Sequence, residues 1–143
     1  MTGFLLDTNV VSELIRTRPE ARVKSWIYAR DEEALYLSVG SIGELRRGFA
    51  MLPPSQRRTQ LERWFESDML PRFQSRILPV THSIADRWGV LDGQSQLNGM
   101  PLGTADGMLA AQRQRFRAAG RGSVRSLGRG VTLAITSSQP ALR

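Results

Sequence analysis

Three acidic residues stand where they could do chemistry together: Asp7, Glu44 and Asp106. Asp7 ends the apolar run GFLLD, and Thr8 and Asn9 follow it at the start of a helical pattern. An ionised carboxylate beside a buried strand costs free energy unless a partner compensates it. That partner could be a metal ion, or the carboxylate could cap the helix by accepting hydrogen bonds from its first amides.

Glu44 and Asp106 also lie near the predicted starts of helices. Ser41 and Glu44 have the spacing of a capping box, in which the Glu bonds back to the N–H of the capping Ser. Thr104 could cap a later helix, which would place Asp106 in a first turn where the helix dipole favours negative charge. Each acid therefore has both a structural and a catalytic interpretation.

The elements that must position these acids alternate between two patterns. Strand-like segments at residues 4–6, 34–39 and 76–80 are separated by segments with helical periodicity. The strand-like segments are apolar throughout, which is typical of parallel strands buried on both faces. We therefore predict an α/β fold with a parallel β-sheet flanked by helices, forming a single domain over residues 1–143.

This fold would bring the acids to one edge of the sheet. The carboxyl ends of parallel strands meet there, and ligands bind at that edge, so Glu44 would be near Asp7. Close carboxylates repel one another unless a cation sits among them. With no Cys and one His in the chain, oxygen ligands would favour Mg²⁺ or Mn²⁺ over Zn²⁺. Acids holding such an ion could activate a water for attack on a phosphodiester.

Composition narrows the class of protein. A chain of 143 residues that is 41% hydrophobic can bury a core as one domain. The absence of Cys excludes disulfides and a cysteine nucleophile. No apolar stretch approaches the ~18 residues of a membrane span, and no signal-peptide pattern is present. We expect a soluble, cytoplasmic protein.

The net charge of +7 is confined to the C-terminal part. Residues 1–106 hold all 13 Asp and Glu and 13 of the 20 Lys and Arg, whereas residues 107–143 hold seven Arg and no acid. A chain that is electrically balanced over most of its length is not a general nucleic-acid coat. The basic tail could still bind phosphate without sequence preference.

Four segments carry a resemblance to a known family: FLLDTNVVSEL, LYLSVGSIGELRRGF, ILPV and GMPLGTADGMLAA. In this order and spacing, from residue 3 to about 111, they resemble a PIN-domain ribonuclease toxin of the VapC/FitB type. The resemblance implies that Asp7, Glu44 and Asp106 are catalytic acids that bind Mg²⁺ or Mn²⁺, with Asn9 as a polar neighbour.

The same resemblance implies a function and partners. It implies a metal-dependent endoribonuclease toxin of a type II toxin–antitoxin system, which hydrolyses the phosphodiester bonds of RNA. It further implies a homodimer that is neutralised by a small antitoxin and reaches operator DNA only through that antitoxin.

The C-terminal part departs from this family. The family has a further acid after a strand near the C-terminus, but no Asp or Glu follows Asp106 here. Residues 112–128 become rich in Arg, Gly, Ala and Ser before VTLAI at 131–135 predicts a final strand, followed by a tail to residue 143. A shifted reading frame over roughly 112–128 would explain this change, and sequencing the gene tests it. A divergent tail is the alternative.

Two other interpretations of the function remain open. A chain without the last acid could be a weakened or inactive PIN-fold protein that acts by binding antitoxin or nucleic acid. A phosphatase or receiver domain also places an Asp after its first strand, but the positions of Asn9 and of the single Lys24 fit both poorly.

Overall fold

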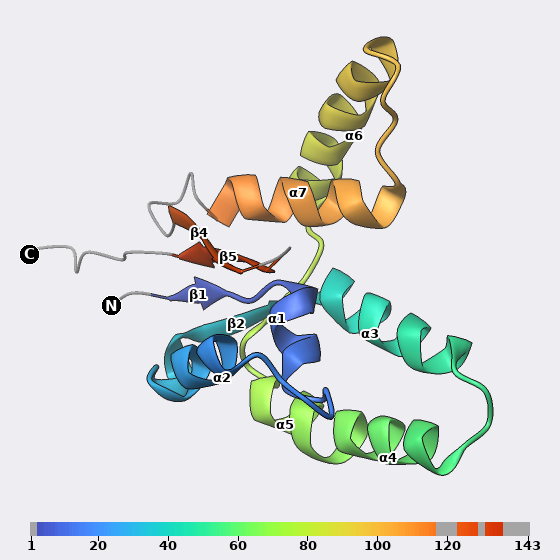
Figure 1. Cartoon of the computed structure of the whole chain (residues 1–143). Helices are drawn as coiled ribbons and strands as arrows, with labels where there is room; N and C mark the ends of the chain where they lie inside the picture. The colour runs from blue at the N-terminus through green and yellow to red at the C-terminus, as the bar shows by residue number, and fades with distance from the viewer. Residues whose placement is uncertain (1–2, 117–122, 129–130, 136–143) are drawn as a thin grey trace, which may run out of the picture.

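The computed structural model describes residues 3–116, 123–128 and 131–135. Residues 117–122, 129–130 and 136–143 of the atypical segment and tail lie outside the described part. Within it, no helix is long and apolar enough to cross a membrane. The elements follow the chain in this order (Figure 1): β1 (Phe4–Leu5), α1 (Thr8–Glu13), α2 (Ala21–Tyr28), the 3-10 turn η1 (Glu32–Ala34), β2 (Leu35–Ser38), α3 (Val39–Met51), α4 (Gln56–Trp64), the π-helical turn η2 (Phe65–Met69), α5 (Leu70–Phe73), β3 (Ile77–Leu78), α6 (His82–Leu97), α7 (Thr104–Phe116), β4 (Ser123–Gly128) and β5 (Val131–Ile135).

The strands form one sheet in the order β3-β2-β1-β5-β4. β1 pairs in parallel with β2, and β2 pairs in parallel with β3, which confirms the predicted α/β fold with a parallel sheet. β5 then adds antiparallel to β1, and β4 antiparallel to β5. The final strand predicted at 131–135 is β5. The apolar pattern misses β4, because SVRSLG lacks the continuous apolar run of the other strands.

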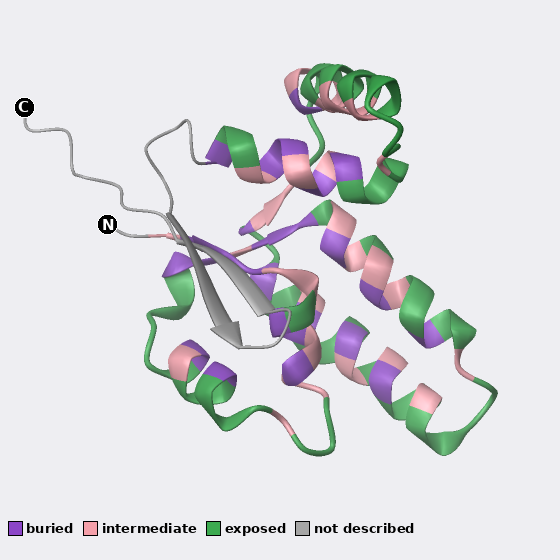
Figure 2. Ribbon diagram, turned by 45° about the horizontal axis from the view of Figure 1, so that its top comes forward, coloured by how far each residue is buried: buried purple, intermediate pink, exposed green. Residues whose placement is uncertain are grey.

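Alternate residues of the central strands face two different apolar clusters, as the twofold period of a strand requires. Phe4 and Leu6 face the main core, which α1 to α5 complete. Leu5 faces the opposite side, where it meets Phe116 of α7, with Tyr36 packed against both. Figures 1 and 2 show α1, α2 and α5 on one side of the sheet and α7 on the other. This explains why the strands are apolar on both faces.

α3 begins earlier than the sequence pattern predicts. Its first residue is Val39, and the Ser38 hydroxyl caps it by accepting a hydrogen bond from Gly40 N at 3.0 Å. The helix therefore starts directly at the end of β2. Ser41, the predicted cap, is already inside the helix.

α7 is held by close packing and by one buried side chain. A Cβ added to Gly107 would collide with the indole of Trp88 on α6, so the two helices approach closely there. Gln112 is buried, and its amide donates to the carbonyls of Leu78 and Pro79, both at 3.1 Å. Its amide oxygen accepts a hydrogen bond from Ser38. These contacts fix the helix that carries Asp106.

Candidate active site

Asp7 lies in the turn between β1 and α1 and serves as the cap of that helix. Its Oδ1 accepts a hydrogen bond from Asn9 N at 3.0 Å. Its Oδ2 accepts one from Arg113 Nη2, with which it forms an ion pair. The capping interpretation of Asp7 is therefore correct, and a second partner that the local sequence does not indicate holds its other oxygen.

Glu44 does not form the capping box that its spacing with Ser41 suggests. Ser38, and not Ser41, caps α3, so the capping-box interpretation is wrong. Glu44 Oε2 instead accepts a hydrogen bond from the Thr8 hydroxyl at the start of α1. Thr8 Oγ1 also lies 2.9 Å from Ser41 Oγ. The carboxylate is thus tied to the helix that follows β1.

Asp106 lies in the first turn of α7, as its spacing after Thr104 predicts. Thr104 is the first residue of the helix rather than a residue before it. Asp106 is exposed, and no hydrogen bond or ion pair to it occurs within residues 3–116. Among the described residues it is the one of the three acids whose side chain has no protein partner.

The three acids line one polar pocket of about 620 Å³. The structure thus brings together the three predicted residues, which are separated by up to 99 positions in the chain. The remaining lining residues are Thr8, Asn9, Arg47, Leu109 and Arg113.

The residues of this pocket have the right donor groups for a metal ion, but their arrangement does not form a metal site. Carboxylates and a hydroxyl are the donors that Mg²⁺ and Mn²⁺ accept, so the donor types fit. In the arrangement described, however, no group of three or more Asp, Glu or His residues over residues 3–116 is placed to hold an ion. Asp7 is paired with Arg113 and Glu44 with Thr8. The pocket therefore has suitable ligands, but two of them are engaged by protein groups.

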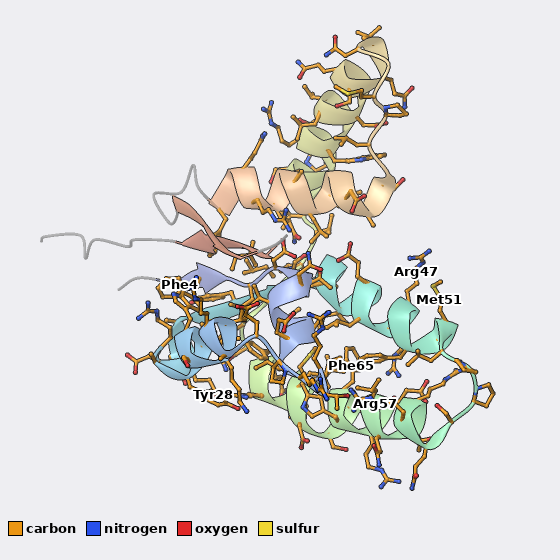
Figure 3. The ribbon with its side chains drawn as sticks, viewed as in Figure 1. Phe4, Tyr28, Arg47, Met51, Arg57 and Phe65 are labelled. Carbon is orange, nitrogen blue, oxygen red and sulfur yellow. The ribbon has the colours of Figure 1, made fainter. Side chains whose placement is uncertain are left out.

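Arg113 and Thr8 are the residues that the sequence did not single out. Arg113 follows Asp106 by seven positions, two helical turns, which places both on one face of α7. That spacing is a usable signal. Thr8 has none beyond its place beside Asp7. Arg47 lines the pocket from α3, and Figure 3 shows it extending from the side of that helix on which α7 lies.

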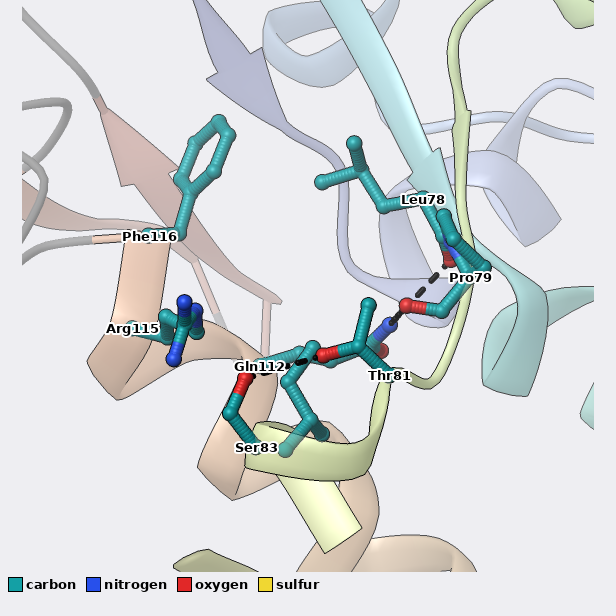
Figure 4. Close-up of a pocket in the computed structure, with 8 residues that line it drawn as sticks. Leu78, Pro79, Thr81, Ser83, Gln112, Arg115 and Phe116 are labelled. Carbon is teal, nitrogen blue, oxygen red and sulfur yellow. Dashed lines mark hydrogen bonds between the residues drawn. The ribbon is translucent and has the colours of Figure 1, made fainter.

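A second pocket, of about 480 Å³, lies between β3, α6 and α7. Its lining is mostly apolar, with Leu78, Ile84 and Phe116 among the residues (Figure 4). Gln112 crosses it to reach the chain at Pro79. It contains no carboxylate among its lining residues and therefore lacks the chemistry of the first pocket.

The chain matches the family model described as PIN domain over residues 4–119, and it belongs to this family. Its similarity to VapC and FitB proteins within this family is supported by individual relatives. The VapC ribonuclease Y4jK of Sinorhizobium fredii (strain NBRC 101917 / NGR234) is 39% identical over 108 residues, which are 76% of this chain and 77% of that protein. The toxin FitB of Neisseria gonorrhoeae (strain ATCC 700825 / FA 1090) is 36% identical, over 76% of this chain and 78% of that protein.

Solved structures agree with this assignment. The crystal structure of FitAcB from Neisseria gonorrhoeae superposes with a TM-score of 0.69 at 34% identity, covering 79% of this chain and 81% of that chain. The structure of FitAB bound to an IR36 DNA fragment superposes with a TM-score of 0.67 at 34% identity, covering 78% of each chain. The predicted family resemblance and the α/β fold are confirmed.

Proposed function

We propose that this protein is an endoribonuclease toxin of a type II toxin–antitoxin system and that Asp7, Glu44 and Asp106 are its catalytic acids. The observation that carries the proposal is the convergence of these acids on one polar pocket in a chain of the PIN family. The names of the relatives, a VapC ribonuclease and the toxin FitB, support RNA as the substrate class.

The same three acids would hold Mg²⁺ or Mn²⁺. When bound there, such an ion would supply a water of lowered pKa and would offset charge that develops on a phosphodiester. This metal dependence is part of the proposal, and its support is the chemistry of the donor set. Asn9 is proposed as a polar residue that helps to orient Asp7, since its backbone N–H already donates to that carboxylate.

The protein groups around the acids have separate tasks. The Thr8 hydroxyl fixes the rotamer of Glu44 by donating to it. Asp106 presents a carboxylate without a protein partner in the described residues. Arg47 is exposed at the rim, where its guanidinium could bind an RNA phosphate. The site would thus combine acids whose side chains are held by protein groups, one acid without such a partner, and the Arg47 guanidinium as a contact for the substrate.

The proposed partners follow from the solved relatives. In one of these structures FitAB is bound to an IR36 DNA fragment. For this chain we propose a cognate antitoxin, contact with operator DNA only through that antitoxin, a homodimer, and action on RNA in the cytoplasm.

A second candidate is a weakened or inactive PIN-fold protein that works through antitoxin or nucleic-acid binding. The observation that favours it is the lack of any Asp or Glu after Asp106. With three acids rather than four, a second metal ion would have few ligands. The reading-frame hypothesis for residues 112–128 remains a prediction that gene sequencing tests.

The deciding experiment is cleavage of RNA by the full chain with and without EDTA. Glu44→Gln and Asp7→Asn should each lower the rate by roughly 100-fold or more, because each removes a charge that would hold the ion. Asp7→Asn keeps a side chain that can cap α1. Glu33→Gln and Asp68→Asn are matched controls at exposed positions outside the pocket. Cleavage that Glu44→Gln leaves unchanged would show that Glu44 is structural.

A further inference from the structure

Arg113 of α7 lines the candidate active site and pairs there with one of its acids. Its guanidinium contacts Asp7 Oδ2, and Arg113 and Asp7 both line the pocket that holds Glu44 and Asp106. With Asn9 N on Oδ1, each oxygen of Asp7 has a protein donor. The Asp7 carboxylate is therefore satisfied by the chain itself.

The carboxylate of this ion pair is less exposed than those of the other ion pairs in the described residues, except Glu13, which pairs with Arg16. The Asp7 side chain is 11% exposed and that of Arg113 is 34% exposed, whereas the Arg46–Glu66 pair is 43% and 60% exposed. Exposed pairs are screened by water and contribute little. A mostly buried carboxylate is screened less, so its attraction for a neighbouring cation is stronger.

The net charge of the pocket also indicates that Arg113 opposes the binding of a divalent ion. Its lining has three acids and two Arg, a formal charge of −1. Removing the Arg113 charge would leave −2, which matches a divalent ion. A guanidinium on a carboxylate oxygen takes up one of its lone pairs, and its positive charge repels a metal ion that approaches the same carboxylate. Occupation by one therefore opposes occupation by the other.

We propose that Arg113 is an internal counterion of Asp7, and that its guanidinium competes with a divalent cation for this carboxylate. This inference rests on the proposed function, because it concerns how the same site is regulated. This competition explains why the pocket has donor groups that suit a metal ion although the described residues form no group of acids placed to hold one. The resting protein is held in a state of low metal affinity.

The test is titration of the full chain with Mn²⁺, followed by calorimetry and without RNA. Arg113→Gln should bind Mn²⁺ about tenfold or more tightly than the wild type, since one competing cation is lost. Arg113→Lys keeps the charge and should stay near the wild type. Adding Asp7→Asn to Arg113→Gln should abolish the gain, which places the bound ion at Asp7.

Two matched variants distinguish the effect of the Asp7–Arg113 contact on Mn²⁺ affinity from the effect of a lost positive charge alone. Arg47→Gln changes the charge of the same pocket but leaves the Asp7–Arg113 contact. Arg115→Gln removes a charge from the same helix outside this pocket. Both should change the Mn²⁺ affinity by less than about threefold, because neither frees an oxygen of Asp7. An equal gain in Arg47→Gln and Arg113→Gln would overturn the proposal, and so would no gain in Arg113→Gln.

Failure of this inference can be told apart from failure of the proposed function. If no variant cleaves RNA but Arg113→Gln binds Mn²⁺ more tightly, the ribonuclease assignment fails and the counterion role stands. If the wild type cleaves RNA with full dependence on Mn²⁺ and the affinity is independent of Arg113, only the counterion role fails. Thermal unfolding of each variant checks that it is folded.

Discussion

The two sides of the acidic pocket are built in different ways. On one side, α1 and α3 leave the carboxyl ends of the neighbouring parallel strands β1 and β2, and the hydrogen bond from the Thr8 hydroxyl to Glu44 joins the two helices. On the other side, α7 reaches the pocket through packing against α6 and through Gln112. The strand ends define the first side. Side-chain contacts of α7 with α6 and with the end of β3 define the second, which should therefore be the side that mutation displaces more easily.

Gly107→Ala should have the largest effect on stability, because it attacks the packing of α7. The added Cβ would meet the indole of Trp88, and the free energy of unfolding should fall by about 3 kcal/mol as for other overpacked sites. Urea unfolding followed by circular dichroism measures this. Gly48→Ala on α3 is the control, since nothing lies within 4 Å of its added Cβ.

A second variant tests the cause of the Gly107→Ala effect. Trp88→Leu shortens the side chain that the new Cβ would strike, so the double variant should be less destabilised than the two single effects predict. Additive effects would show that Trp88 is not what limits the site. The buried Trp88 Nε1 has no hydrogen-bond partner within the described residues, so its removal leaves no polar group stranded.

Gln112→Leu should have the next largest effect. It keeps the size of the side chain but removes its bonds to Ser38 and to the carbonyls of Leu78 and Pro79. Leaving buried carbonyls without donors should lower the free energy of unfolding by about 2 kcal/mol. Gln114→Leu, at an exposed position of the same helix, should change it by less than about 0.5 kcal/mol. Equal effects of the two variants would contradict the anchoring role of Gln112.

The difference between the two sides also explains what the sequence could predict. The α1–α3 side follows from short-range rules: apolar runs mark β1 and β2, and an acid follows each run near a helix start. The sequence therefore predicts Asp7 and Glu44 together. It mistakes the partner of Glu44, because Ser38 and Ser41 are both good caps and only the end of β2 decides between them.

The α7 side depends on information that is not local. Asp106 is found through its helix start, but its distance from the strand ends is set by Gly107 against Trp88 and by Gln112. Neither contact has a sequence pattern. Arg113 shares a face with Asp106 by its spacing, yet nothing local predicts that it pairs with Asp7. Strand β4 is missed for the related reason that it forms by pairing with β5.

Thr8→Val should have a smaller effect, on the first side of the pocket. The loss of the Thr8 hydroxyl removes the donor to Glu44 and separates α1 from Ser41. We expect the free energy of unfolding to fall by about 1 kcal/mol, as for a single partly buried hydrogen bond. Thr8→Ser keeps the hydroxyl and should remain closer to the wild type. Should Thr8→Val be as damaging as Gly107→Ala, the two sides would not differ as we infer.

Glu32→Gln should have the smallest effect and gives the scale of an exposed ion pair in this chain. Arg72 Nε donates a hydrogen bond of 2.5 Å to Glu32 Oε1. This bond holds the pKa of Glu32 below its usual value of 4.5, and the positive charges of Arg72 and Arg76 lower it further. Because the pKa is lowered in the folded state, the stabilisation is present above the unfolded pKa and is lost as the pH falls through the folded pKa.

The advantage of the wild type over Glu32→Gln should therefore exist at pH 7 and disappear as the pH falls below 4.5, the usual value for this group. Since the Glu32 side chain is 44% exposed, the advantage should stay below about 1 kcal/mol even at pH 7. Urea unfolding of both proteins across this pH range measures it. The Asp7–Arg113 pair, whose carboxylate is far less exposed, should exceed this value when Arg113→Gln is unfolded under the same conditions. If the two pairs contribute equally, the pocket does not strengthen the ion pair, and the second side of the site is held by the packing of α7 and by Gln112 without it.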